Sequence, residues 1–261
     1  YSEPYRSGGI NYIRNSIKVT VDAYSGDTHF YAMDNQDPLI QTYQKVYKGL
    51  FKSFDEMPAN LKRHIRYPKD LFTLQASLYN TYHMTDTQVF YNREDLWAIP
   101  QEIYGETEKV MEAYYMVTRL PGDERDSFVI MLPFTPTNKN NMISWMAAKC
   151  DPDSFGQLRV FKFSKERTIY GPTQIESRID QDTDISQKLT LWGQVGSRVI
   201  RGNLMVVPIE DSLIYVEPIY LQATQSKFPE LKRVIFSYGD KISRNLSKIY
   251  KGSSEFLVRS C

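Results

Sequence analysis

The chain has 261 residues, of which 41% are hydrophobic and 24% are charged. These values are typical of a globular chain and exclude one that is disordered throughout. Its 32 basic and 31 acidic side chains nearly cancel, which excludes the strongly basic surface that nucleic acid or an anionic membrane would attract.

Aromatic and cysteine content narrow the class further. The chain holds 19 Tyr, and Tyr suits half-buried surfaces because its ring packs while its hydroxyl stays hydrated. This richness fits strands with one wet face, or a surface that contacts glycan or protein.

Of the two cysteines, Cys261 is terminal, so we expect no disulfide between it and Cys150. No apolar run approaches the roughly 18 residues needed to cross a bilayer. Because the chain begins at Tyr1 rather than Met, we interpret it as a fragment of a longer protein.

The first predicted element is a β-hairpin. Residues 17–24 alternate apolar and polar side chains, which is the period of a strand with one buried face. Ser25-Gly26 then offers a two-residue turn, with Gly able to adopt a positive φ. With this turn Val21 faces Phe30, and the apolar side chains of both strands share one face.

Helices are predicted next, each beginning at a proline. Asp37-Pro38 joins a capping carboxylate to a proline at the first helical position, and Pro58 and Pro68 can open two more helices. Gly49 is placed to end the first helix. The apolar face of that helix is formed at helical spacing by Leu39, Tyr43, Val46 and Leu50.

From Ala113 onward the periodicity becomes that of strands. Residues 172–191 are predicted to contain helix, and the apolar run 142–148 is too short to distinguish helix from strand. The predicted strands are 114–120, 127–133, 158–163, 198–208, 212–221 and 233–238, with a hairpin around Glu210-Asp211. We expect the tail after Ile242 to be helical or loosely held.

The fold class predicted from these elements is α+β. An N-terminal β-hairpin is followed by a helical segment, and then by a mainly antiparallel β region with short helices. We treat residues 1–261 as a single domain. An alternative is a subdivision into 1–112, with the hairpin and helices, and 113–261, which is mainly β.

The densest polar and aromatic cluster runs from Tyr82 to Pro100. Thr85 with Gln88 has the capping-box pattern, so a short helix is predicted to run through Phe90. Two readings of the cluster remain open. Its carboxylates could form a glycosidase pair, such as Asp86 with Glu94, beside a stacking platform of aromatic rings. Alternatively, Asp86 caps the helix and Arg93 pairs with a carboxylate. The candidate binding residues here are Tyr91, Trp97, His83 and Glu94.

A second set of candidates alternates along the chain at Gln174, Glu176 and Arg178. In an extended segment these side chains would line one face and could bind a sugar or a carboxylate. In a helix they would spread around it, and a polar network that anchors a connector becomes the better interpretation.

Metal and catalytic motifs are sparse. Asp151 and Asp153 begin a calcium-loop pattern that continues to Gly156, but Lys162 stands where the closing Glu should be, so an ordinary turn is the alternative. The three histidines lie on separate elements, and no nucleophile elbow, phosphate-binding loop or zinc motif is present. The sequence therefore predicts no cofactor.

Several long blocks resemble uncharacterised protein family 0182, whose members are large bacterial and archaeal multi-pass membrane proteins. The likeness runs from about Gly8 to Ile242. It is carried by residues 11–18, 21–24, 82–100, 133–136, 171–180, 196–204 and 208–218. It implies that transmembrane helices precede this segment and that the segment is the large part outside the cytoplasm. The acidic tail of many members is absent, which puts any role that rests on that tail in doubt.

These observations favour a non-enzymatic domain, tethered to the cell membrane on its extracytoplasmic face. Its expected partners are the membrane part of its own parent chain, which it would regulate, or an envelope protein or glycan. The sequence leaves the oligomeric state open. An envelope glycan hydrolase that uses a carboxylate pair is the alternative function.

Overall fold

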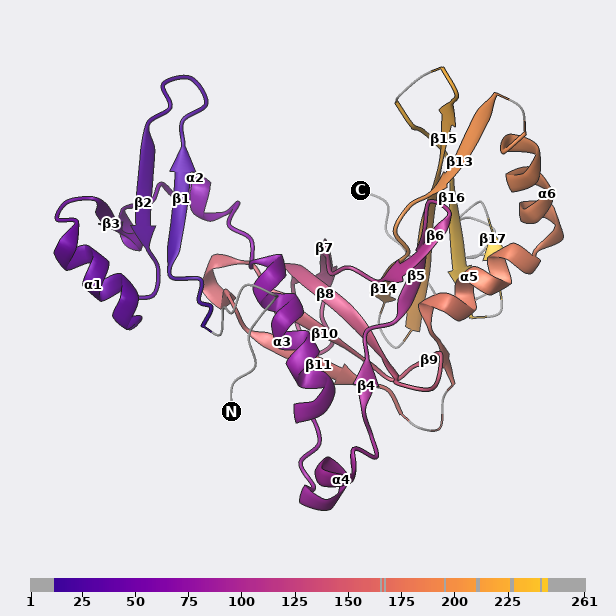
Figure 1. Ribbon diagram of the computed structural model, residues 1–261, viewed down its shortest axis with the longest axis horizontal. Coiled ribbons are helices and arrows are strands. Elements are labelled where there is room, and N and C mark those ends of the chain that lie inside the picture. Colours follow the sequence, from indigo (N-terminus) through magenta and orange to yellow (C-terminus); the bar gives the residue numbers. More distant parts are fainter. Residues whose placement is uncertain are drawn as a thin grey trace.

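The computed structural model describes residues 12–164, 166, 168–194, 196–209, 212–225, 228–239 and 241–243. Mixed helices and mostly antiparallel strands confirm the α+β class. Three parts follow one another along the chain: a small N-terminal sheet, a central sheet and a C-terminal sheet (Figure 1). We call residues 12–66 the N-terminal arm and residues 67–243 the body.

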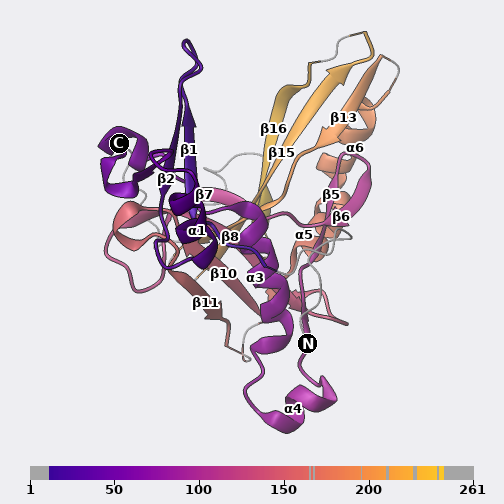
Figure 2. The same ribbon diagram turned by 60° about the vertical axis from the view of Figure 1, so that its left-hand side comes forward.

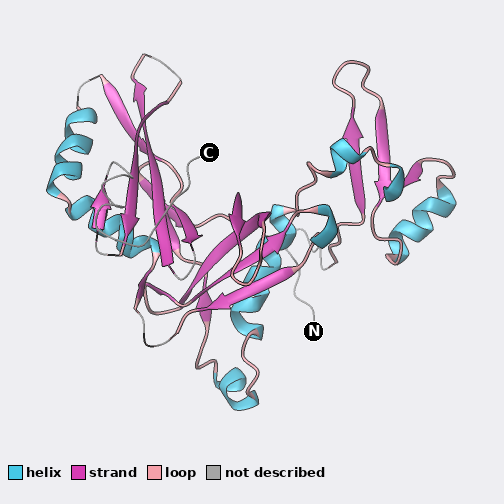
Figure 3. Ribbon diagram, turned by 180° about the vertical axis from the view of Figure 1, so that it is seen from behind, coloured by secondary structure: helices cyan, strands magenta, loops and turns pink. Residues whose placement is uncertain are grey.

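The arm stands to one side of the body in two views (Figures 1 and 3). It contains the hairpin β1 (Ile17–Val21) and β2 (Thr28–Ala32), and β3 (Phe51–Ser53), which pairs parallel to β2. Its helices are α1 (Pro38–Val46), the 3₁₀ helix η1 (Phe54–Glu56) and α2 (Ala59–Lys62). The predicted helix starts at Pro38 and Pro58 are confirmed.

The predicted register of the first hairpin is wrong by two residues. Val19 pairs with Phe30 and Val21 with Thr28, because the strands are joined by residues 22–27 rather than by a two-residue turn. The Asp22 carboxylate accepts hydrogen bonds from the backbone N–H groups of Tyr24 and Ser25, which stabilises the longer loop. A shift of two residues keeps each side chain on its face.

The central sheet is built around the long strand β8 (Asp126–Pro136). It pairs antiparallel with β7 (Tyr114–Arg119), β10 (Ser144–Lys149) and β4 (Trp97–Ala98), and β11 (Leu158–Lys162) pairs with β10. Residues 144–149 are therefore strand, which resolves the open choice for that run. Helix α3 (Lys69–Tyr82) lies across this sheet, and the short helix α4 (Thr87–Asn92) projects beyond it (Figure 2).

The C-terminal sheet has β15 (Ser212–Ala223) at its centre. On one side lie β13 (Ser197–Arg201) and β14 (Met205–Ile209), and on the other lies β16 (Glu230–Tyr238), followed by β17 (Lys241–Ser243). The expected continuous strand 198–208 is interrupted at Gly202, whose N–H donates to Pro218 O and whose Cα lies too close to Pro218 for a side chain. The predicted turn residues Glu210-Asp211, and the tail from residue 244, lie outside the described residues.

Two helices and two small ladders join these sheets. The predicted helical segment is two helices, α5 (Pro172–Gln181) and α6 (Thr183–Trp192), separated at Asp182. The hairpin of β5 (Gln101–Tyr104) and β6 (Thr107–Val110) packs against α5. Strand β9 (Asn141–Met142) pairs with β12 (Ile169–Tyr170), and the 3₁₀ helix η2 (Pro152–Ser154) precedes β11.

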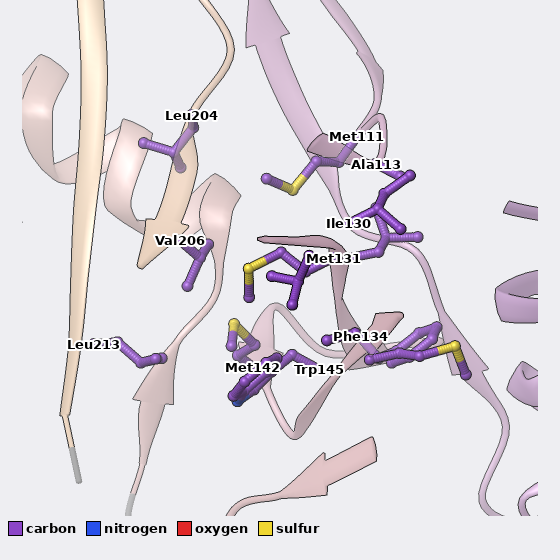
Figure 4. Packing of buried hydrophobic residues seen from close by; sticks show 14 of the residues in the cluster. Met111, Ala113, Ile130, Met131, Phe134, Met142, Trp145, Leu204, Val206 and Leu213 are labelled. Atoms are coloured by element: carbon purple, nitrogen blue, oxygen red, sulfur yellow. The ribbon is translucent and has the colours of Figure 1, made fainter. Parts of the chain in front are cut away.

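One hydrophobic core spans the body. Methionine and aromatic side chains fill the space where the central sheet faces β14 and the start of β15 (Figure 4). Phe134, Met131 and Leu204 are completely or almost completely buried there. The hydroxyl of Tyr114 bonds both the N–H and the C=O of Val206, so a side chain rather than strand pairing joins the two sheets. No helix in the described part of the chain is long and apolar enough to span a membrane.

Candidate functional site

The stretch Tyr82–Pro100 comprises the end of α3, all of α4 and strand β4. Its helix cap is Asp86, whose Oδ1 accepts hydrogen bonds of 2.9 Å from the N–H groups of Gln88 and Val89. The capping box predicted from Thr85 is therefore wrong by one residue, and the capping role considered for Asp86 is correct. Glu94 accepts a hydrogen bond from the Asn92 side chain. Both carboxylates of the hypothetical glycosidase pair thus have structural partners.

Trp97 is buried rather than exposed, which corrects its role as a stacking surface. The His83 ring stacks on its indole with centroids 3.7 Å apart, and Lys162 Nζ lies 5.2 Å from the indole centroid. His83 Nδ1 lies 3.0 Å from Tyr79 O, and Nε2 lies 3.5 Å from a carboxylate oxygen of Asp95. His83 and Trp97 therefore form one packed unit that attaches α3 to β4.

Tyr91 is the candidate that does face solvent. Its side chain is 87% exposed on α4, the short helix that projects from the body. A single exposed ring is common on protein surfaces and does not by itself define a site.

The two predicted candidate stretches approach each other at β9. A pocket of about 370 Å³ is lined by Asp95 and Trp97 from the first stretch and by Asn141 from β9. Gln174 from the second stretch donates to Asn141 Oδ1 at 3.1 Å. Next to it, Gly171 is required, because a Cβ there would lie 1.9 Å from the carbonyl oxygen of Asn140. Gln174 therefore holds Asn141, which lines the pocket, and does not line the pocket itself.

The candidates Gln174, Glu176 and Arg178 lie on helix α5, so their side chains point in different directions, as predicted for a helical segment. Glu176 is buried, whereas Arg178 lies outside over the ring of Tyr170 at 4.6 Å. These side chains do not share one binding face. Instead, Glu176 points into a group of buried charges that we call the carboxylate cluster: Glu102, Glu176, Arg201 and Glu217.

The carboxylate cluster joins four elements of the body. Arg201 on β13 donates to both carboxylate oxygens of Glu217 on β15, and its third contact is Asp180 Oδ1 at 2.7 Å. Glu176 on α5 accepts from the N–H of Ile103 at 2.7 Å. Glu102 on β5 accepts from the N–H of Leu204 at 3.0 Å. Backbone and side chains thus fix the hairpin β5–β6 to α5 and to the C-terminal sheet.

Burial dominates the electrostatics of the carboxylate cluster. It raises the pKa of Glu176 to about 8, against the opposing effect of the Ile103 N–H. Burial also raises the pKa of Glu102 and of Glu217. For Arg201, burial lowers the pKa, but the hydrogen bonds and charge of Glu217 outweigh it and keep the guanidinium charged. Such a site holds structure together and can also bind protons.

Arg201 and Glu217 were missed by reasoning from the sequence. Their partnership crosses between strands, and no spacing along the chain reveals it. The available signal was a single charge inside an apolar run, at Val199-Ile200-Arg201 and again at Val216-Glu217-Pro218. A charge at a buried strand position requires a partner, because an unpaired buried charge is costly.

The weak calcium candidates have other partners or surroundings. Asp151 accepts a hydrogen bond from the N–H of Phe128, and Asp153 is exposed on η2. Among the residues that the structure describes, no group of three or more His, Cys, Asp or Glu side chains is arranged to hold a metal ion. Cys150 is buried with a free thiol, and Cys261 lies outside the described residues.

An apolar surface on the arm is the remaining feature. Helix α1 has Ile40 as its buried residue, whereas the side chains on its predicted apolar face are open to solvent. Their exposed fractions are 51% for Leu39, 48% for Tyr43 and 63% for Val46. These residues are spaced four and three apart and so form one stripe along the helix. We call them the α1 stripe.

Comparisons with known proteins place the chain among long proteins. Residues 1–192 match the model of the Uncharacterised protein family (UPF0182). A UPF0182 protein of Methanospirillum hungatei is 57% identical over 249 residues, which cover 93% of this chain and 28% of that protein. One from Pelotomaculum thermopropionicum is 58% identical over 242 residues, covering 93% of this chain and 26% of that protein. The chain thus spans about a quarter of the length of these relatives. No solved structure matches it.

Proposed function

Because the chain belongs to the UPF0182 family, whose members compared above are about four times as long, we propose that it is a non-catalytic docking domain within such a polypeptide. In this proposal the domain lies outside the cytoplasm, tethered to the membrane part of its parent chain. The α1 stripe binds another segment of the same polypeptide. The observation that carries the proposal is the exposure of the apolar face of an amphipathic helix.

An amphipathic helix normally buries its apolar face against its own domain. In the arm, α1 turns only Ile40 inward, and the α1 stripe remains uncovered. Further large apolar side chains of the arm are exposed nearby in the sequence: Val19, Val21, Tyr24, Tyr47 and Leu50. An apolar stripe that its own domain leaves uncovered is the kind of surface that serves as an interaction site.

The length of the relatives argues for an occupant in the same polypeptide. About three quarters of each relative lies outside the region matched by this chain. A segment tethered to the domain has a high effective concentration, so a modest apolar contact suffices to hold it in place. The occupant is therefore a predominantly apolar segment that covers Leu39, Tyr43 and Val46.

The contacts of the domain favour docking over catalysis. Asp86 and Glu94 each have a structural hydrogen bond, and the carboxylate cluster is buried. The basic side chain nearest Glu94 in sequence, Arg93, ends α4 in the left-handed conformation, which is a cap geometry. These contacts support structural roles for these residues within the body.

Site-specific photo-cross-linking tests the docking proposal. A photo-reactive amino acid replaces Val46 in a full-length polypeptide that contains this chain, and cross-linked peptides are mapped after irradiation in membranes. The same replacement at Leu191, which is 62% exposed on α6, is the control. We expect Val46 to cross-link to a segment outside residues 1–261 of the same polypeptide, and Leu191 to give no such product.

Three outcomes would overturn this assignment. Cross-links from Val46 to a second copy of the chain would make the α1 stripe an oligomer interface. Cross-links to a different protein would make it an envelope receptor surface. Absence of any product specific to Val46 would show that the α1 stripe is solvated in the full-length protein.

A further inference from the structure

Two buried carboxylate oxygens in the carboxylate cluster accept no hydrogen bond from the part of the chain that the structure describes. They are Oε2 of Glu176 and Oε1 of Glu102, and both residues are only 1% exposed. Buried polar atoms almost always have a partner. Two such atoms within one group of charges therefore indicate a binding partner that the contacts between non-hydrogen atoms do not show.

Counting charges around Glu176 identifies what is missing. Glu217 and Asp180 both bind Arg201. Lys109 Nζ lies 3.7 Å from Glu102 Oε1 and also contacts Glu112. Arg201 and Lys109 thus already have carboxylate partners, and among the described residues Glu176 forms no ion pair within 4 Å. A buried carboxylate without a cation is strongly unfavourable, and the usual response is to bind a proton.

We propose that Glu176 is a proton-binding site that is occupied at neutral pH, and that proton release weakens the packing of α5 against β5. The proton resides on Oε2, because Oε1 already accepts the N–H of Ile103. When the proton leaves, a negative charge appears beside Glu102 on β5 and Glu217 on β15, and it is opposed by the Ile103 N–H and by the shared Arg201.

The surroundings from each packed element agree with this assignment. Burial is the largest contribution that raises the pKa of Glu176, to about 8, and the charges of Glu217 and Glu102 raise it further. The Ile103 N–H and Arg201 lower it, but do not reverse the direction. Proton release therefore falls within a mildly alkaline range, between neutrality and about one unit above the pKa.

Direct observation of the Glu176 carboxyl tests the proposal. Side-chain carboxyl carbons of the whole chain are followed by NMR from about pH 5 to about pH 10. The signal assigned by its loss in Glu176→Gln should titrate with a midpoint near 8, and not near the ordinary value of 4.5. A midpoint below about 6 would overturn the proposal, since Glu176 would then be ionised at neutral pH.

Amide hydrogen exchange tests whether proton release from Glu176 changes the packing of α5 against β5, or whether Glu176 titrates without any effect on that packing. In the unsubstituted chain, exchange protection of the Ile103 N–H should fall at least about tenfold between about pH 7 and about pH 9, after correction for the intrinsic rate. In Glu176→Gln this protection should stay constant, because a neutral amide mimics the protonated acid. Glu108→Gln, at an exposed position on β6, should behave as the unsubstituted chain does.

Two further outcomes would count against a proton. Equal loss of Ile103 protection in all three proteins would show that Glu176 does not control the packing. A Glu176 midpoint that moves below about 6 on addition of sodium or potassium chloride would identify a monovalent cation as the ligand instead. If Glu176→Gln fails to fold, the titration of the unsubstituted chain decides, with the signal assigned through its neighbours.

Discussion

The arm and the body differ in how many apolar side chains they bury. In the body, the central sheet, the C-terminal sheet and α3 enclose a continuous core, with residues such as Phe134 and Leu204 fully buried. In the arm, the buried apolar side chains are few: Tyr31, Ala32, Ile40 and Met57. A unit of that size can enclose only a small core, so contact with another surface would add to its stability. This difference is the basis of the proposal that another segment completes the arm.

The junction between arm and body is correspondingly light. Lys18 Nζ, on β1 of the arm, lies 5.3 Å from the ring centre of Phe155 in the body. The guanidinium of Arg66 lies over Tyr115 at 5.3 Å. Such contacts contribute about 0.5–1 kcal/mol each when partly exposed. They fix the place where the arm leaves the body but do not cover the α1 stripe.

One carboxyl group in each region has a shifted pKa, and the two shifts have opposite directions. In the arm, the hydrogen bond from Ser16 is the largest effect that holds the pKa of Asp37 below its usual value, and this carboxylate caps α1. In the body, burial raises the pKa of Glu176. The capping of α1 by Asp37 should therefore be lost as pH falls, whereas the contribution of Glu176 should be lost as pH rises toward about 8.

The largest expected effect is on the core of the body. Phe134→Ala removes a fully buried ring and should lower the free energy of unfolding by about 3–5 kcal/mol. Val117→Ala, at a 67% exposed position of the same sheet, should change it by less than about 0.5 kcal/mol. Denaturant titration measures both. Equal effects would show that the central sheet is not the stabilising core of the body.

The next effect is the loss of stability of the body as pH rises from about 4.5 to about 8. The pKa of Glu176 is raised in the folded state, so its contribution is fully present below the ordinary value of 4.5 and is lost as pH rises toward about 8. The cost is roughly 1.4 kcal/mol for each unit of pKa difference, before relaxation of the neighbouring charges. Unfolding free energies of the unsubstituted chain and of Glu176→Gln should diverge over that range. Parallel pH profiles would contradict the sign of the effect.

A smaller, local effect is expected in the arm at acid pH. The pKa of Asp37 is depressed, so its stabilisation of α1 is present above the usual Asp value and is lost as pH falls through the folded value. Exchange protection of the Leu39 N–H, which donates to Asp37, should therefore fall on acidification. Asp37→Asn should remove most of this pH dependence, and Asp55→Asn, at an exposed site, should leave it intact.

The smallest expected effect is that of the α1 stripe on stability. Leu39→Ser, Tyr43→Ser and Val46→Ser should each change the unfolding free energy of the isolated chain by less than about 0.5 kcal/mol, because these side chains are already solvated. Ile40→Ser, one residue along the same helix, should cost several times more. A comparable loss at Tyr43 would show that the arm itself buries the stripe.

Local signals in the sequence predicted much of the fold. Asp37-Pro38 and Pro68 mark helix starts that the structure confirms, because caps and prolines act within one turn of helix. Long-range pairing was not predictable in the same way. The parallel strand β3 and the hairpin β5–β6 were missed, since both depend on partners that lie elsewhere in the chain. The register of the first hairpin failed because its loop is longer than the glycine suggested.

For the candidate site, the sequence indicated the residue types but not their surroundings. Glu176 was considered either as a ligand-binding side chain or as part of a polar anchoring network, and in the structure it is buried and accepts a hydrogen bond from the N–H of Ile103. Trp97 was expected to be open, yet His83 stacks on it. In both cases tertiary contact decides burial, and a periodic pattern does not report which face of a short element meets the core.

Accessibility of the α1 stripe in the full-length polypeptide tests the central claim most directly. Val46→Cys and Leu191→Cys are labelled with a maleimide in the isolated chain and in the full-length protein, with the unsubstituted proteins as background. Both positions are more than 60% exposed here, so both should react rapidly in the isolated chain. A docking domain predicts at least about tenfold slower labelling of Val46→Cys in the full-length protein, with Leu191→Cys unchanged. Equal labelling of Val46→Cys in both proteins would contradict it.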